Sequence, residues 1–327
     1  MTLHIGTDEA GYGPNLGPLV VAATVWRVAG DDTEAAIARA VAAVDGLASA
    51  HRAGRAAPLW ADSKQIHRGS DGFAALERGV AIGLAVATAD VPGTWESLER
   101  RLGPVSPRGG YRDQWRLLAD LRLPRATDPA AAVGLATRAR DALAKHGVTL
   151  ERVACRCVYP AEFNAALDAG LNKSDILSAA TLDLAADLRA AVPDAPAVIW
   201  CDRHGGRKRY GGLVARHFRR TLVQPVEETA ARSAYAVPPE AGAAGQAGCL
   251  IEFRVGGETR APVALASMAA KYVRELAMQA FNAFWTARLP GLAPTAGYPV
   301  DAARWRRDAA AALAAENVRD DDFWRRA

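Results

Sequence analysis

The first 26 residues constrain the fold most strongly, because an apolar strand there ends in two acids and a glycine-rich loop. Leu3 and Ile5 lead directly into Asp8 and Glu9, and a loop rich in glycine and proline follows. Residues 19–26 are apolar at nearly every position, which is typical of a strand buried on both faces. The pattern therefore predicts a β-hairpin with carboxylates at its turn.

The two neighbouring acids can serve one site only if the strand ends where they stand. Successive side chains of a strand point to opposite faces, so Asp8 and Glu9 converge only where the backbone turns. Gly11 and Gly13 allow such a turn and leave N–H groups free to meet a phosphate or a sugar. The alternative is an ordinary polar turn, since Asp and Gly are common turn residues. The hairpin alone leaves both interpretations open.

Composition limits the class of protein. The 327 residues are half hydrophobic and 23% charged, which excludes disordered, collagen-like and coiled-coil chains. The net charge of +4 is too mild to identify a nucleic-acid partner. Without a signal peptide or a long apolar span, we expect a soluble, cytoplasmic protein without membrane contact. The four cysteines form no CxxC pair, so buried free thiols are favoured over zinc ligands or disulfides.

Hydrophobic periodicity and capping residues predict an α/β fold. We expect helices at 31–48, from Ser70 to about 80, 128–145 with Asp128 as N-cap, 174–188 with Ser174 as N-cap, 262–285 and from Asp301. We expect strands at 82–88, 148–159, 197–202, 222–226 and 249–255. We predict one domain over residues 1–327, with an insertion at about 90–150 and a helical extension at about 290–327. The strand at 197–202 ends in Asp202, and a basic loop follows it.

The longest predicted helix carries three polar residues on one face. Ser267, Lys271 and Glu275 stand at i, i+4 and i+8 among apolar neighbours. A solvated stripe with one ion pair is the alternative, and would contribute a few tenths of a kcal/mol. Because the rest of this stretch offers little polar surface, we interpret the three residues as part of a site.

An ordered set of sequence blocks resembles the type 2 ribonuclease H family (ribonuclease HII-like), of which this chain looks like a divergent member. The blocks are GTDEAGYGP at 6–14 with Gly17-Pro18, Asp62-Ser63-Lys64, DILSAATL at 175–182, Asp202 at a strand end, ASMAAKYVRE at 266–275 and AGYP at 296–299. Each block alone is weak evidence for this family, whereas the whole set of blocks in this order is specific to it. The resemblance covers about half of the chain.

The resemblance implies a ribonuclease H-like mixed β-sheet flanked by helices. It implies a metal-dependent endonuclease that hydrolyses the RNA strand of RNA/DNA hybrids or ribonucleotides embedded in DNA. The catalytic and metal-binding residues would be Asp8, Glu9, Asp202 and Glu275. Ligation by carboxylate oxygens alone favours Mg²⁺ or Mn²⁺ over Zn²⁺. Such ions activate a water and stabilise the leaving oxygen in phosphodiester cleavage.

Further residues are candidates for contacts with the nucleic acid. They are Gly11, Tyr12, Gly13, Lys64, Arg207, Lys208, Arg209, Ser267, Lys271 and Tyr298. The basic residues among them would position phosphates without reading sequence. Tyr298 would pack on a sugar or a base as the family's tyrosine does, or would simply close the turn at 294–299.

Two positions depart from the family pattern. Tyr12 replaces the usual arginine of the loop that senses the ribose 2′-hydroxyl, and Glu275 replaces an aspartate. A nuclease of the same fold with a branched or single-stranded substrate is therefore an alternative function. A third possible function is that of a non-catalytic nucleic-acid-binding protein, although such a protein has no need to gather acids near phosphates.

Overall fold

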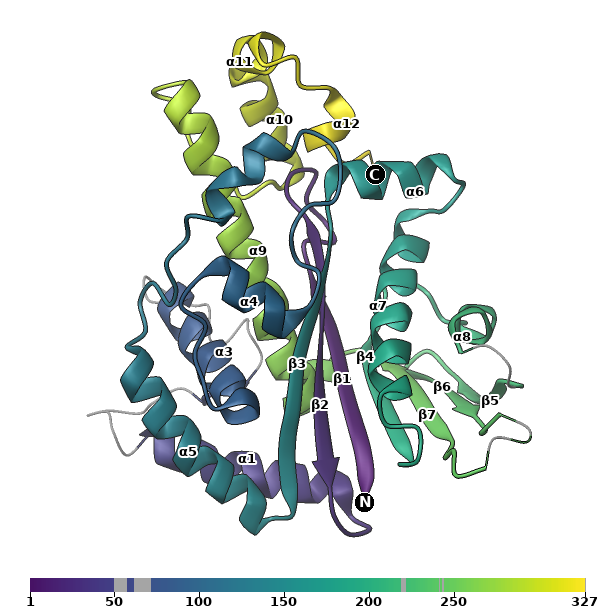
Figure 1. Ribbon diagram of the computed structural model, residues 1–327. Helices are drawn as coiled ribbons and strands as arrows, with labels where there is room; N and C mark the ends of the chain where they lie inside the picture. The colour runs from purple at the N-terminus through teal and green to yellow at the C-terminus, as the bar shows by residue number, and fades with distance from the viewer. Residues whose placement is uncertain (50–57, 62–71, 219–221, 241, 243, 327) are drawn as a thin grey trace.

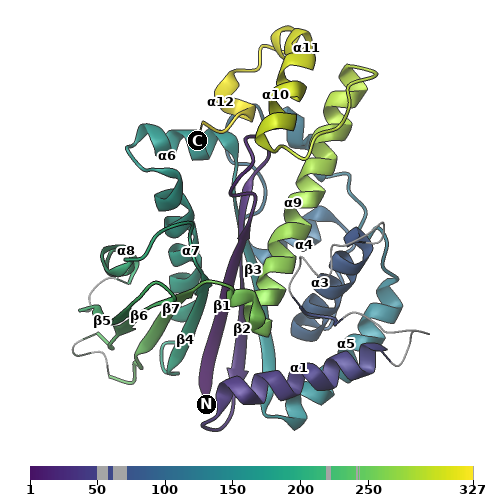
Figure 2. The ribbon, with the colours of Figure 1, turned by 180° about the vertical axis from the view of Figure 1, so that it is seen from behind.

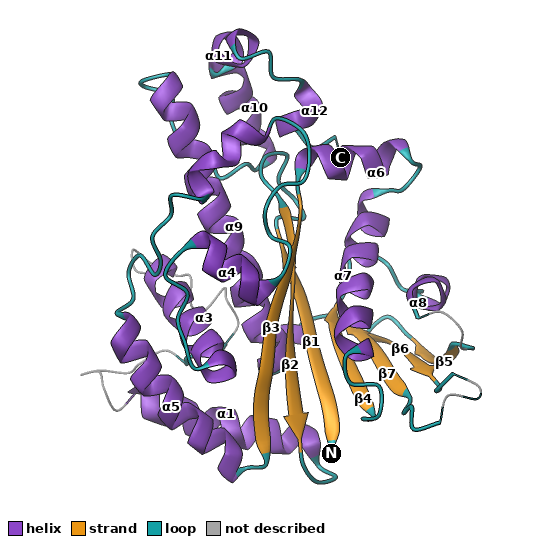
Figure 3. Ribbon diagram, in the orientation of Figure 1, coloured by secondary structure: helices purple, strands orange, loops and turns teal. Residues whose placement is uncertain are grey.

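The computed structural model describes the whole chain except residues 50–57, 62–71, 219–221, 241, 243 and 327. Its centre is a mixed seven-stranded sheet in the order β3-β2-β1-β4-β7-β6-β5 (Figures 1 and 3). The strands are β1 Thr2–Ala10, β2 Leu19–Val28, β3 Val148–Val158, β4 Ala197–Asp202, β5 Gln224–Glu228, β6 Arg232–Val237 and β7 Cys249–Arg254. β4 runs parallel to both β1 and β7, and the other pairs are antiparallel.

Helices cover both faces of the sheet (Figure 2). α9 (Ala261–Arg288) packs on one face together with α3 (Gly72–Thr88), and α7 (Lys173–Ala190) packs on the other. The remaining helices are α1 Thr33–Ser49, α4 Trp95–Leu102, η1 Arg112–Leu118, α5 Pro129–Lys145, α6 Pro160–Asp168, α8 Gly211–His217, η2 Gly257–Thr259, α10 Pro299–Asp308, α11 Ala310–Ala315 and α12 Asp320–Phe323. The predicted α/β fold with a mixed sheet flanked by helices is confirmed.

A glycine in β1 lets α9 approach the sheet closely. A Cβ atom added to Gly6 would lie 2.3 Å from the backbone carbon of Pro262, in the first turn of α9. The Thr24 hydroxyl of β2 donates to the Pro262 carbonyl at 2.7 Å. These contacts set the start of α9 beside β1, so that the helix then runs along the strand that carries the two acids.

Several local predictions match the structure. β1 and β2 form the expected antiparallel hairpin. α5 begins at Pro129 with Asp128 as its N-cap, as predicted. The four cysteines are free and buried. In the described part of the chain, every helix is too short or too polar to cross a membrane.

Other local predictions are wrong. Residues 82–88 belong to helix α3 and not to a strand. This stretch is apolar on nearly every side because α3 lies against α5, α9 and β3, and a short apolar run cannot by itself distinguish a buried helix from a strand. The N-cap of α7 is Asn172 and not Ser174, with Asp175 completing a capping box.

The ends of the remaining predicted elements shift by a few residues. The strand expected at 222–226 is observed as β5, Gln224–Glu228, and the helix expected from Asp301 begins at Pro299. β6 was not predicted. Ser70 and the Asp62-Ser63-Lys64 block lie outside the described residues.

Candidate active site

The ends of two parallel strands bring three carboxylates to one edge of the sheet. Thr7 of β1 lies opposite Cys201 of β4, so Asp8 and Asp202 follow directly from a matched pair of residues. Glu9 comes next in β1, one residue before the strand ends at Ala10. The structure thus gathers three of the four predicted acids, from segments almost 200 residues apart in the sequence.

Burial and mutual repulsion raise the pKa of the first two acids. Burial raises the pKa of Asp8 well above its usual value, and the charges of Glu9, Asp202 and Glu258 raise it further. A hydrogen bond with Ser267 opposes the rise. Burial and then the charge of Asp202 raise the pKa of Glu9 to about 7. Like charges gathered in a poorly hydrated place favour either a proton or a bound cation.

The donor chemistry of this cluster suits a hard divalent cation. Carboxylate oxygens and one hydroxyl are the donors that Mg²⁺ and Mn²⁺ prefer. The side chains as they stand do not form a coordination shell, because no three acidic, histidine or cysteine residues of the described chain are placed to share one ion. The carboxylates would have to rotate to bind one.

α9 contributes a hydroxyl and an ammonium group to the cluster. The Lys271 ammonium donates to the Ser267 hydroxyl oxygen at 3.2 Å, and the Ser267 hydroxyl donates to Glu258 Oε1 at 2.9 Å. Lys271 Nζ also lies 3.7 Å from Glu258 Oε1. The charge of Lys271 lowers the pKa of Glu9, so it partly offsets the negative charge of the site.

Glu275, the fourth predicted acid, has different surroundings. Its Oε1 lies 4.0 Å from Nη1 of the preceding Arg274, and the carboxylate is 38% exposed. It lines a hollow of about 250 Å³ together with Met278, Gln279, Asn282 and residues 294–296. Asp8 and Glu9 instead respond to Asp202 and Glu258.

Glu258 is the carboxylate that the sequence analysis missed. It stands in η2, between the end of β7 and the start of α9, and its side chain is 13% exposed. The available signal was an acid between a buried strand and a long helix, four residues after the end of β7. Asp202 was identified by a different signal, as the last residue of an apolar strand. The neighbouring Gly257 N–H donates to Asp202 Oδ1 at 3.0 Å.

Two buried arginines contact the glycine loop that follows β1. Gly11 has φ +83°, and a Cβ atom there would lie 2.6 Å from both Arg274 Nε and the Pro18 carbonyl oxygen. Arg325, near the end of the described chain, donates to the carbonyls of Gly11 and Pro14. Only glycine fits position 11 without moving this packing.

Two tyrosines lie beside the loop. The Lys173 ammonium lies 4.9 Å from the centre of the Tyr12 ring, in a cation–π contact. Tyr298 is 56% exposed, and its ring carbon Cε1 lies 3.9 Å from the position of a Cβ on Gly13. An exposed aromatic ring next to backbone N–H groups is suited to stack on a sugar or a base.

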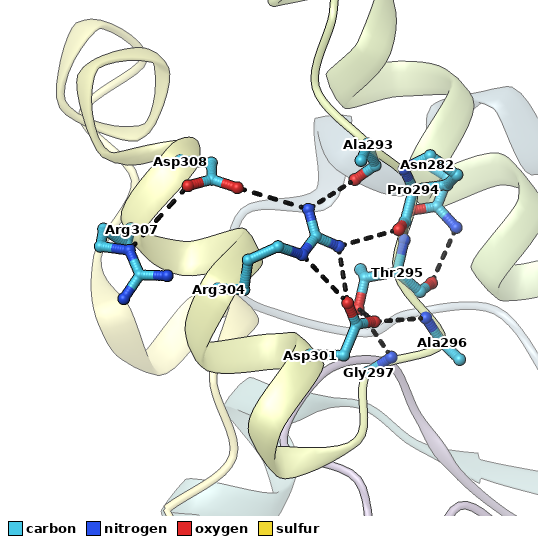
Figure 4. A network of polar contacts seen from close by, with 10 residues as sticks. All are labelled: Asn282, Ala293, Pro294, Thr295, Ala296, Gly297, Asp301, Arg304, Arg307 and Asp308. Carbon is cyan, nitrogen blue, oxygen red and sulfur yellow. Dashed lines mark hydrogen bonds and ion pairs between the residues drawn. The ribbon is translucent and has the colours of Figure 1, made fainter.

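A polar network supports the turn that carries Tyr298 (Figure 4). Asp301 Oδ2 accepts hydrogen bonds from the Thr295 hydroxyl at 2.5 Å and the Ala296 N–H at 3.1 Å. Arg304 donates to Asp301 and to the carbonyls of Ala293 and Pro294 (Figure 4). These bonds close the turn, so the Tyr298 ring is left exposed on a fixed backbone.

The basic loop after β4 divides into two parts. Arg207 Nη2 lies 2.5 Å from Asp175 Oδ1, so this residue ties the loop to α7. Lys208 and Arg209 are exposed, and Arg209 Nε lies 3.6 Å from Glu228 Oε2. Lys208 and Arg209 are therefore the residues of this loop, among those predicted to contact phosphates, whose side chains are exposed to solvent. Lys64 lies outside the described residues.

Comparison with known proteins yields similar structures but no similar sequence. Neither a family model nor a curated protein matches the chain. A Bst-RNase HIII in complex with Mn²⁺ is 16% identical, with a TM-score of 0.41, over 94% of this chain and 62% of that one. The RNase HII of a PCNA complex from Archaeoglobus fulgidus is 13% identical, with a TM-score of 0.39, over 98% and 93%.

A third similar structure is the ribonuclease H2 from Pyrococcus horikoshii OT3. It is 14% identical, with a TM-score of 0.40, over 98% of this chain and 92% of that one. This chain spans less than two thirds of the RNase HIII chain.

Proposed function

We propose that this chain is a metal-dependent endonuclease that hydrolyses the RNA strand of RNA/DNA hybrids, or ribonucleotides embedded in DNA. The observation that supports it is the convergence of Asp8, Glu9 and Asp202 at one sheet edge, where burial and mutual repulsion raise the pKa of Asp8 and Glu9. Protein interiors rarely gather acids in this way without a cation to hold.

Each residue of the site has a proposed role. Asp8, Glu9 and Asp202 would hold Mg²⁺ or Mn²⁺, which supplies an activated water and charge stabilisation of the leaving oxygen. Ser267 and Lys271 orient the acids and carry a compensating charge. The N–H groups of Gly11 and Gly13 and the exposed ring of Tyr298 would contact the ribose and the base.

The alternative substrate class follows from Tyr12. Its ring is engaged by Lys173, and a phenol offers one donor where a guanidinium offers five. This difference favours a looser requirement for a ribose junction. A nuclease acting on branched or single-stranded nucleic acid is therefore the second candidate.

One assay tests both candidate functions. The purified chain, with Mg²⁺ or Mn²⁺, is offered a matched panel: RNA/DNA hybrid, DNA duplex with one ribonucleotide, all-DNA duplex, and branched and single-stranded substrates. We expect the hybrid to be cut faster than the DNA duplex, and Asp8→Asn to abolish cutting. Equal cutting of hybrid and DNA duplex would favour the second candidate. No cutting of any substrate, with Asp8→Asn binding as well as the wild type, would indicate a binding protein.

A further inference from the structure

A lysine at the start of α7 lies against the glycine loop that follows β1. The Lys173 ammonium group stands 4.9 Å from the centre of the Tyr12 ring. Tyr12 packs against the apolar cluster between the sheet and α7, whereas Lys271 belongs to α9 on the other face of the sheet. The two lysines therefore flank the end of β1 and its loop from opposite faces.

Helix stability does not explain the position of Lys173. It is the first residue of α7, where the helix dipole disfavours a cation. The acid of the same turn, Asp175, accepts from the Asn172 N–H at 3.3 Å and lies 2.5 Å from Arg207 Nη2. Among the residues that the structure describes, no carboxylate lies within ion-pairing distance of the Lys173 ammonium group. Its positive charge is therefore not neutralised by a neighbouring acid.

A second cation beside the loop adds to this charge. Arg325 is 1% exposed, and its Nη2 donates to the carbonyls of Gly11 and Pro14. Within the described chain, its Nε and Nη1 are buried without a hydrogen-bond partner. Burial lowers the pKa of Lys173, and the charge of Arg325 lowers it further. Because a buried charge without a counter-charge is costly, an anion bound beside the loop would stabilise both cations.

Basic groups continue along the surface next to Tyr12. A Cβ atom on Gly205 would lie 3.4 Å from the Tyr12 hydroxyl oxygen, so the loop that follows β4 borders this ring. That loop carries the exposed Lys208 and Arg209. Cationic groups that come from several elements along one sheet edge suit a chain of phosphates better than a single small anion.

We propose that Lys173 is a phosphate-binding residue, which holds a backbone phosphate of the nucleic acid on the α7 side of the glycine loop. The Tyr12 ring positions its ammonium group. This assignment rests on the nucleic-acid substrate of the function proposed above, and it does not depend on cleavage. A bound strand then crosses the sheet edge between Lys271 on one face and Lys173 on the other.

Binding of a fluorescent RNA/DNA hybrid in EDTA tests the assignment, because EDTA prevents cleavage. Anisotropy titrations over a range of salt concentrations give the slope of log K against log salt. Lys173→Met keeps the length of the side chain and removes its charge. We expect it to make this slope shallower by roughly one unit, which is about tenfold weaker binding at about 0.1 M salt if both proteins bind alike at about 1 M. Lys173→Arg, which keeps the charge, should retain the wild-type slope.

Two further variants test the position of the charge. Tyr12→Leu removes the ring under the ammonium group and should weaken binding by about two- to fivefold, whereas Tyr12→Phe keeps the ring and should match the wild type. Lys145→Met is the matched control, since Lys145 is exposed at the end of α5, and it should bind like the wild type. Circular dichroism of each variant verifies folding.

A scan with single methylphosphonates distinguishes a direct contact from a structural effect. Each hybrid of the scan carries one uncharged phosphate. We expect one position at which the wild type loses affinity and Lys173→Met loses none. Equal losses at every position in both proteins, or an unchanged salt slope in Lys173→Met, would overturn the assignment and leave the nuclease proposal intact. A wild type that binds no hybrid at low salt would overturn both.

Discussion

Glu9 should make the metal-free protein less stable as pH rises, and a single substitution isolates this effect. Its pKa moves from an ordinary value of 4.5 to about 7 because burial and Asp202 disfavour the charge. A raised pKa of an acid means that the folded state binds the proton more tightly than the unfolded state does. The contribution of Glu9 to the free energy of unfolding is therefore most favourable below pH 4.5, and it is lost as pH rises through about 7.

The size of the effect follows from the displacement of the pKa. At about 1.4 kcal/mol per pH unit, the difference between 4.5 and about 7 corresponds to about 3 kcal/mol of unfolding free energy. Glu9 is not fully buried, and water reduces the penalty. We therefore expect Glu9→Gln to match the wild type near pH 4.5 and to exceed it by about 1 to 3 kcal/mol at pH 8.

The difference between the two proteins is the informative quantity, because two histidines act in the opposite direction. Burial lowers the pKa of His4 to about 4 and that of His204 to about 3. A base with a lowered pKa adds stability that is fully present above its ordinary value of 6.5 and is lost as pH falls. Both histidines are shared by the wild type and the variant, so their effect cancels in the difference.

Urea unfolding in EDTA, at half-unit steps from pH 4.5 to 8, provides the measurement. Glu96→Gln is the control, since its carboxylate is 81% exposed. Mn²⁺ at one hundred times the wild-type Kd should then stabilise the wild type at pH 8 by about 2.7 kcal/mol, and Glu9→Gln by less. A difference between wild type and Glu9→Gln that does not change with pH would refute the reasoning.

Three further predictions concern substrate contacts. Replacing both Lys208 and Arg209 by Ala should weaken duplex binding regardless of sequence and flatten the salt dependence by roughly one unit of slope per lost contact; an unchanged slope in a fluorescence-anisotropy titration would assign the loop to another role. Tyr12→Arg should increase the ratio of kcat/KM for a single embedded ribonucleotide to that for a long hybrid, because a guanidinium has more donors for the sugar; a ratio that stays constant or falls would contradict this. Arg325→Met should lower the unfolding free energy by about 2 to 4 kcal/mol, since two buried loop carbonyls lose their donor at about 1 to 3 kcal/mol each; a urea midpoint equal to that of the wild type would show that the loop does not depend on it.

Local sequence determined the features that depend on neighbouring residues. The hairpin followed from the apolar runs on either side of a glycine loop, and the limits of α5 followed from its capping residues. The strand-end positions of Asp8 and Asp202 followed from the apolar runs that precede them. Hydrophobic period and turn chemistry are short-range signals, so they can be identified without knowing the fold.

Only the tertiary structure decided which distant groups meet. Residues 82–88 could be assigned to a helix only once α5, α9 and β3 were seen to surround them. Ser267 donates to Glu258, because η2 folds back beside the start of α9, whereas helical periodicity alone placed only Lys271 and Glu275 on the same face as Ser267. Arg325 supports the glycine loop from more than 300 residues away. Such contacts depend on how whole elements pack, and no local pattern encodes them.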